Sequence, residues 1–232
     1  GVGKTTTSHA MCAGLAQKGF KVLGIDMDPQ GNFSAACGAE NLDVSTIYEL
    51  MRGDSDITDT IQSLKSGFDI IPSNIMLAGA EQELSQTGKE YRLKESIESV
   101  KKKYDFIIID TPPSLGILTV NAFTAAGIFA TTGINQLNIT VKSVQEYCNA
   151  ALKITGILFT RFNPRANISK QIKELTEQLS KYISAPIYKT YIRTAVAIEE
   201  AQANKMDIFN YAHKSTVSED YKDFIDEFLK GC

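Results

Sequence analysis

The run GVGKTTT at residues 1–7 constrains the fold more than any other part of the chain. Its glycines allow a turn in which backbone N–H groups point at phosphate oxygens, and the pattern that follows predicts a helix over residues 5–18. Lys4 can neutralise phosphate charge, and the Thr5 hydroxyl can bind Mg²⁺ at the helix N-terminus. An ordinary glycine-rich turn with a surface lysine is the alternative. The sequence therefore predicts a phosphate-binding loop made of Gly1, Val2, Gly3, Lys4, Thr5 and Thr6.

Apolar residues at consecutive positions, as in FIIID and VLGID, indicate strands that are covered on both faces in a parallel sheet. Strand patterns fall at residues 22–28, 69–72, 106–110, 154–162 and 187–192. Helical patterns fall between them, at residues 5–18, 93–103, 118–126, 134–147, 168–182 and 217–229. This alternation predicts an α/β fold with a doubly wound, mostly parallel sheet flanked by helices.

The pattern contains no internal repeat, low-complexity tract or Pro/Gly-rich linker, so residues 1–232 are expected to form a single domain. Two places do not fit this alternation. A phosphate-binding loop needs a buried strand before it, so we expect a first strand upstream of Gly1 that the chain lacks. The six residues GIFATT that follow Ala126 are too few for a strand and its turns, so we expect a missing segment near residue 127.

Two of the expected strands end in carboxylates. In the run IIIDTPPS the apolar strand ends at Asp110, which could hold Mg²⁺ through a water molecule, although many strands end in an aspartate. The run VLGIDMDPQGN places Asp26 and Asp28 at the edge where α/β sheets bind ligands. Alternation would turn the two side chains opposite ways while strand geometry lasts, so we expect them to have different roles, and Asp26 is a possible metal ligand. An ordinary Asp-Pro turn is the alternative for both.

A net charge of −3 would normally argue against nucleic-acid binding, because a polyanion needs a positive surface, but the charge of this chain is unevenly distributed. Residues 151–193 carry eight Lys and Arg against two acids, whereas the residues from 194 onward carry four Lys against eight Asp and Glu. No segment approaches the roughly 18 apolar residues of a membrane span, and no signal segment opens the chain, so we expect a cytoplasmic protein. The four cysteines show no spacing typical of metal ligands.

The runs GVGKTTT, DMDPQGN and YDFIIIDTPPSLG, in this order, resemble the ParA/MinD family of deviant Walker A ATPases, and most closely its ParA/Soj partitioning branch. The resemblance extends to DIIPSN, NAFTAA, GILFTRFNPRANIS and the EEA of IEEA, and so covers nearly the whole chain. It implies a P-loop NTPase that binds ATP and Mg²⁺ and hydrolyses ATP weakly when alone. In that family a first lysine of the loop reaches the partner's phosphates, and it would lie upstream of Gly1.

The resemblance also implies roles for matching residues. Lys4 would contact the β- and γ-phosphates, and Thr5 would bind the magnesium. Asp28 would orient or activate the attacking water, and Asp110 would hold the water shell of the metal. Phosphoryl transfer would then depend on positioning and charge neutralisation. Two switch segments would include Pro29, Asn32, Thr111 and Pro112.

Partners are implied in the same way: an ATP-dependent homodimer, DNA bound without sequence preference at the nucleoid, and a ParB-like protein that stimulates hydrolysis. The chain departs from the usual pattern at IRTAVAIEEA. There Arg193 stands in place of an adenine-side proline, and Ala197 in place of an arginine that often contacts DNA. The implied adenine-side residues are Arg161, Phe162 and Arg193. The implied DNA-facing residues, for which a solvated helix face is the alternative, are Arg165, Lys170 and Lys173.

A second interpretation keeps the ATPase but gives it a protein assembly or a membrane system as cargo, as in MinD-like proteins. No membrane partner is expected, because the C-terminal helical pattern is acidic and anionic lipid would repel it. Its apolar stripe is typical of core packing and consists of Tyr221, Phe224, Ile225, Phe228 and Leu229. A third interpretation is a metabolic or redox relative, such as an amidotransferase-like synthetase or the nitrogenase iron protein, whose cluster-binding cysteines are lacking. A purely structural DNA-binding module would not need Asp28 beside the loop.

Overall fold

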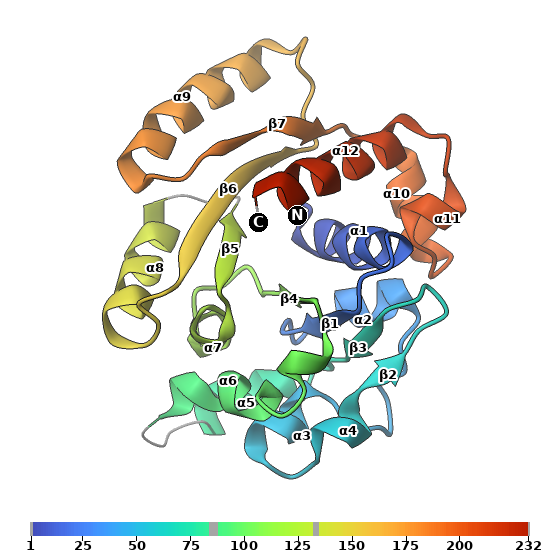
Figure 1. The fold of residues 1–232 in the computed structure, drawn as a ribbon, viewed down its shortest axis with the longest axis vertical. Helices are drawn as coiled ribbons and strands as arrows, with labels where there is room; N and C mark the ends of the chain where they lie inside the picture. Colours follow the sequence, from blue (N-terminus) through green and yellow to red (C-terminus); the bar gives the residue numbers. More distant parts are fainter. Residues whose placement is uncertain (1, 84–87, 132–134, 232) are drawn as a thin grey trace.

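The computed structural model describes residues 2–83, 88–131 and 135–231 (Figure 1). Its strands form two sheets, of order β2-β3-β1-β4 and β5-β6-β7. All of these pairings are parallel except that of β2 with β3. The mostly parallel α/β fold is thus confirmed. The strands are β1 (Val22–Asp26), β2 (Gln62–Ser63), β3 (Asp69–Ile71), β4 (Phe106–Asp110), β5 (Ile128–Thr131), β6 (Lys153–Thr160) and β7 (Ile187–Ile192).

Helices flank both sheets, as Figure 1 shows. The longer ones are α1 (Lys4–Gln17), α7 (Ile117–Ala125), α8 (Asn135–Tyr147), α9 (Asn167–Ile183), α10 (Val196–Ala203) and α12 (Thr216–Gly231). The shorter ones are α2 (Asn32–Cys37), α3 (Ile47–Arg52), α4 (Ile57–Thr60), α5 (Leu77–Glu83), α6 (Arg92–Ile97), α11 (Ile208–Tyr211) and the 3₁₀ turns η1 (Lys89–Tyr91) and η2 (Lys101–Lys103). None of the described helices is both long and apolar enough to cross a membrane.

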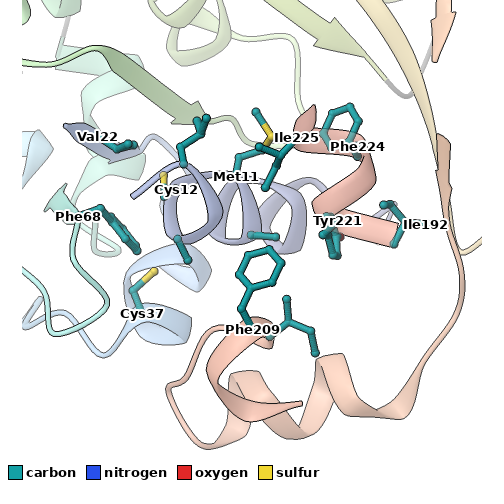
Figure 2. Close-up of a cluster of buried hydrophobic side chains, with 14 of the residues drawn as sticks. Met11, Cys12, Val22, Cys37, Phe68, Ile192, Phe209, Tyr221, Phe224 and Ile225 are labelled. Carbon is teal, nitrogen blue, oxygen red and sulfur yellow. The ribbon is translucent and has the colours of Figure 1, made fainter. Parts of the chain in front are cut away.

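Strand β1 is buried along its whole length and separates two hydrophobic cores. Because alternate residues of a strand face opposite sides, Leu23 and Ile25 pack into one core, with residues of α3, α5 and α6. Val22 packs into the other core, where α1 meets α2, α11 and α12. Figure 2 shows the side chains around α1, including Phe209 of α11 and Phe224 of α12. These contacts hold the middle and the C-terminal half of α1 in place.

The C-terminal helix α12 packs as its apolar stripe predicts. Tyr221, Phe224, Ile225 and Phe228 are all buried against α1 and its surroundings. The acidic side of the helix is less exposed to solvent than the sequence suggests. Asp220 is buried, and the carboxylate of Glu227 accepts hydrogen bonds from the backbone N–H groups of residues 189 and 190 in β7. The Glu227 carboxylate therefore attaches α12 to the β5-β6-β7 sheet.

The expectation that GIFATT is too short for a strand was wrong. Strand β5 (Ile128–Thr131) forms within these six residues and pairs in parallel with β6. Parallel strands need a crossover connection, and helix α8 provides the one between β5 and β6. The short segment after Ala126 therefore has to supply only the strand. Residues 132–134 lie outside the described part of the chain. A further strand before residue 1 stays a prediction, as does the single-domain organisation of residues 1–232.

Other boundaries shifted for local reasons. The strand expected over residues 22–28 ends at Asp26, since the chain turns toward α2 before Pro29. The helix expected over residues 93–103 is divided into α6 and η2, which are separated by residues 98–100. The short helices α2, α3 and α4 are too brief to show a clear period in the sequence.

Candidate nucleotide site

A groove of about 750 Å³ opens beside the N-terminal end of α1. Its lining includes Asp28 and Pro113, which lie two and three residues after the ends of β1 and β4, and the last residues of β6 and β7, Thr160 and Ile192. The carboxyl ends of four parallel strands therefore meet at this groove, which is where open α/β sheets bind ligands. The groove also receives most of the predicted phosphate-binding loop, namely Val2, Gly3, Lys4, Thr5 and Thr6. Gly1 lies outside the described residues.

The loop enters α1 through a left-handed turn at Gly3, which has a φ of 80°. A residue with a Cβ would be strained in this conformation. The turn lets α1 begin at Lys4, so the unpaired N–H groups of the first helical turn face the groove. Together with the Lys4 ammonium group they favour an anion at this end of the helix.

Hydroxyl groups of the first turn of α1 bind the end of β4. The Thr5 Oγ1 donates a hydrogen bond of 2.7 Å to the Asp110 Oδ2, and the Ser8 Oγ donates one of 3.2 Å to the Oδ1. The sequence predicted that Thr5 and Asp110 act on one metal, and the fold places them in direct contact across 105 positions of sequence. Ser8 was not predicted.

The neighbouring hydroxyls bind other elements. The Thr6 Oγ1 accepts a hydrogen bond of 3.1 Å from the Gln202 Nε2 of α10. The Thr7 Oγ1 lies 3.3 Å from the Tyr221 hydroxyl of α12. The consecutive hydroxyls of TTTS thus connect the loop to β4, α10 and α12. Sequence reasoning missed Gln202 and gave Tyr221 only a packing role, because contacts this distant in sequence leave no local pattern.

The Asp110 carboxyl group is almost completely buried, and its environment disfavours a negative charge. Its pKa is raised to about 7, chiefly by burial and also by the charge of Asp26, although hydrogen bonds from Thr5 and Ser8 and the charge of Lys4 act in the opposite direction. A cation beside Asp110 would favour the ionised form. The Thr5 hydroxyl and this carboxylate are oxygen groups of the kind that bind Mg²⁺, which keeps several water ligands and needs few from the protein. The described residues hold no cluster of three or more His, Cys, Asp or Glu side chains that could hold a metal by themselves.

Asp26 and Asp28 have different environments. Asp28 lines the groove and caps the turn that follows it, with its Oδ1 accepting from the backbone N–H of Gln30. Asp26 is fully buried: its Oδ2 accepts from the N–H and the hydroxyl of Ser34, and its Oδ1 accepts from the N–H of Asp28. Burial raises the pKa of Asp26 to about 6, although these hydrogen bonds lower it. This geometry favours Asp26 as the anchor of the β1–α2 turn rather than as a metal ligand.

Comparison with known proteins points to the same family as the sequence motifs. The AAA domain family matches residues 1–154. The sporulation initiation inhibitor protein Soj of Bacillus subtilis is 41% identical over 239 residues, covering 98% of this chain and 93% of that protein. The chromosome partitioning protein ParA of Myxococcus xanthus is 35% identical, covering 99% and 84%. The chain belongs to the ParA/Soj family.

Solved structures share the fold. Cobyrinic acid a,c-diamide synthase from Mycobacterium smegmatis, solved with bound ADP and magnesium, has a TM-score of 0.85 at 29% identity and covers 99% of this chain and 90% of that one. McdA of Cyanothece has a TM-score of 0.87 at 24% identity, covering 99% and 95%. Sequence identity to the partitioning proteins is higher than to the synthase, so the ParA/Soj family is the better guide to this site.

The residues that the ParA/Soj pattern puts near adenine are only partly brought together. Arg161 and Arg193 line the groove, but Phe162 does not: its ring packs against those of Phe159 and Tyr191, with centroids 5.1 Å and 5.2 Å away. The Arg193 guanidinium group is already engaged, because its Nε and one Nη donate to the Asp220 carboxylate at 2.6–3.1 Å. Arg193 therefore fastens the segment after β7 to α12.

Only one of the four predicted switch residues lines the groove. Asn32 is the first residue of α2 and lines the groove. Pro29, Thr111 and Pro112 lie in the connections beside it but are not part of its lining, whereas Pro113 is. Both connections lie next to groove residues, which allows a bound ligand to influence them.

The DNA-facing candidates lie away from the groove. Arg165 is exposed in the loop before α9, and Lys173 is exposed on α9. Lys170 is also part of α9, but its side chain is outside the described part of the structure. Ala197, in place of the expected arginine, is partly buried in α10 and packs against a hydrophobic core. The three DNA-facing candidates thus lie on α9 or in the loop before it.

Proposed function

We propose that the chain is a Mg²⁺-dependent ATPase whose nucleotide occupies the groove at the start of α1. The hydrogen bond between Thr5 and Asp110, beside Lys4 and the free N–H groups of the helix, carries this proposal. Lys4 would neutralise the β- and γ-phosphates, and Thr5 and Asp110 would hold Mg²⁺, Asp110 through water. The metal would supply charge neutralisation on the phosphate oxygens. Asp28, at the groove wall, would orient or activate the attacking water.

We further propose that ATP binding joins two chains and that the dimer binds DNA without sequence preference. The relatives named Soj and ParA support this function, as does the excess of basic residues in the α9 region. Arg165, Lys170 and Lys173 would contact phosphates, and a ParB-like partner would stimulate hydrolysis and release. Pairing doubles the basic surface, so DNA binding should depend on ATP. The protein would work in the cytoplasm at the nucleoid.

DNA retention tests this function. Non-specific duplex DNA is incubated with the protein and Mg²⁺, with ATP, with ADP or without nucleotide, at rising salt. We expect retention only with ATP, and a steep decline with salt because phosphate contacts release counterions. Equal retention by the nucleotide-free protein would count against the switch. Retention that is absent under all conditions, together with normal ATP turnover, would favour a protein assembly as cargo.

A further inference from the structure

Among the described residues, four that are not glycine have a positive φ: Asp43, Arg161, Ser184 and Lys205, with values of 52–56°. The left-handed region is unfavourable for residues with a Cβ, and long side chains gain no local hydrogen bond there as Asp does. Arg161 and Lys205 both line the groove, and both carry a positive charge. Unfavourable backbone conformations persist where the surrounding structure imposes them, and they are concentrated at functional sites.

The two residues are connected to different parts of the phosphate-binding loop. Arg161 directly follows Thr160, whose Oγ1 donates a 2.6 Å hydrogen bond to the carbonyl oxygen of Val2. Lys205 lies three residues after Gln202, whose Nε2 donates to Thr6. Each positively charged residue is thus close in sequence to a side chain that is bonded to the loop. The loop and the two strained residues form one connected unit.

The Lys205 side chain has a defined path. Its methylene groups pass over Gly38, at the C-terminal end of α2, where an added Cβ would lie 3.4 Å from the Lys205 Cβ. Gly38 itself has a φ of 72°, so it leaves room for this stem and ends α2 in the left-handed conformation. A lysine stem that packs on the protein while its head reaches a groove is a common arrangement.

We propose that Lys205, which lines the groove, is a phosphate-binding residue, held in its strained conformation so that its ammonium group meets the phosphate chain of the nucleotide. This assignment rests on the proposed ATP binding. The charge balance of the groove supports it, since Arg193 is already paired with Asp220 and the polyphosphate of a nucleotide carries several negative charges. A lysine suits such a ligand as a point charge.

A local structural role gives a different expectation. The Lys205 ammonium group could act only on the last carbonyl groups of α2, where a positive charge is favourable. In that case removing the charge would lower the melting temperature and leave nucleotide affinity unchanged. The two roles are therefore separated by measuring stability and affinity on the same variants.

The test uses three variants of the full chain, with Mg·ATP as the probe. Lys205→Met keeps the stem and the strain but removes the charge, so we expect the Kd to rise about tenfold at an unchanged melting temperature. Lys205→Gly removes the charge and the strain, so we expect the same loss of affinity with a melting temperature raised by roughly 2 °C. Lys205→Arg keeps the charge and should keep the affinity.

Ser184→Gly is the matched control, because it relieves a positive φ at the end of α9, outside the groove lining. It should raise the melting temperature without changing the Kd. An unchanged Kd in Lys205→Met, beside a wild type that binds, would overturn the role of Lys205 alone. A wild type that does not bind Mg·ATP would overturn both this role and the proposed ATPase.

Discussion

The carboxyl group of Asp110 lies between Thr5 and Ser8, and burial raises its pKa to about 7. Mg²⁺ favours the ionised carboxylate, so binding should displace the proton that this group holds near neutral pH. We expect the affinity for Mg·ATP to rise between about pH 6 and pH 8, with about half a proton released per site at pH 7. Calorimetric titration in two buffers of different ionisation enthalpy measures this release. The release should disappear in Asp110→Asn.

The same group makes a prediction for stability without ligand. The pKa in the folded state, about 7, is above the ordinary value of 3.8, so the stabilisation from the protonated form is complete below pH 3.8 and is lost as the pH rises to 7. Asp110→Asn should therefore gain stability over the wild type at pH 8, on the order of 2–4 kcal/mol, and much less at pH 4. Urea unfolding at the two pH values measures this. An equal difference in the free energy of unfolding between variant and wild type at both pH values would contradict the assigned pKa.

Asp28 is expected to act in hydrolysis and not in binding, because it lines the groove while its Oδ1 accepts from the N–H of Gln30 rather than from the phosphate-binding loop. Asp28→Asn keeps an acceptor for the N–H of Gln30 but cannot take a proton. We expect its turnover to fall by about 10²–10⁴, with the Kd for Mg·ATP within about threefold of the wild type. Asp28→Ala should show the same loss of turnover. Normal phosphate release by either variant would remove Asp28 from the mechanism.

At the residue scale, sequence alone identified the groups that have a local signature. Lys4 and Thr5 belong to a glycine loop, and Asp110 ends a strand, so motif and position both marked them. Asp26 and Asp28 have the same residue type and nearly the same position, and only packing distinguishes them, because Ser34 binds one and not the other. Gln202 and Tyr221 reach the loop from elements near the C-terminus, so no motif of the loop could indicate them.

At the scale of elements, α1 approaches α12 so closely that Gly14 has no room for a side chain. A Cβ on Gly14 would overlap the Ile225 Cδ1 and lie 3.0 Å from the Phe209 ring. Gly14→Ala should therefore destabilise the protein by about 1–2 kcal/mol, although alanine is the better helix former. Ile225→Val removes the overlapping methyl group, and the double variant should lose less than the sum of the two single changes. Denaturant unfolding of all four proteins gives this coupling; strict additivity would contradict the packing.

The sequence predicted helices and strands most accurately where their apolar pattern extends over several residues. Strands β4 and β7 have the expected bounds, and α12 buries the expected stripe, because their apolar positions repeat over several residues. Strand β5 was excluded on loop length alone, and it forms because an adjacent strand offers parallel pairing to a four-residue segment. The helices α2, α10 and α11 line or support the groove, yet one or two turns give little periodicity to detect.

At the scale of the whole molecule, the overall charge of −3 conceals an excess of basic residues over the range 151–193, which includes α9. We expect Arg165→Ala together with Lys173→Ala to weaken ATP-dependent DNA retention and to reduce the slope of log affinity against log salt by about one unit for each phosphate that is no longer neutralised. Turnover of ATP without DNA should be unchanged, since neither residue lines the groove. Lys102→Ala together with Lys103→Ala removes the same number of positive charges outside this region and serves as the control. An equal loss of retention in the control would mean that net charge alone governs binding.

The proposed function of this chain depends on nucleotide binding at the start of α1. Isothermal titration of Mg·ATP into the wild type and into Lys4→Ala, with melting temperatures to confirm folding, tests it most directly. We predict saturable binding of one nucleotide per chain in the wild type and at least about tenfold weaker binding in Lys4→Ala. A folded wild type without affinity for Mg·ATP, or a Lys4→Ala variant that binds as tightly, would contradict it.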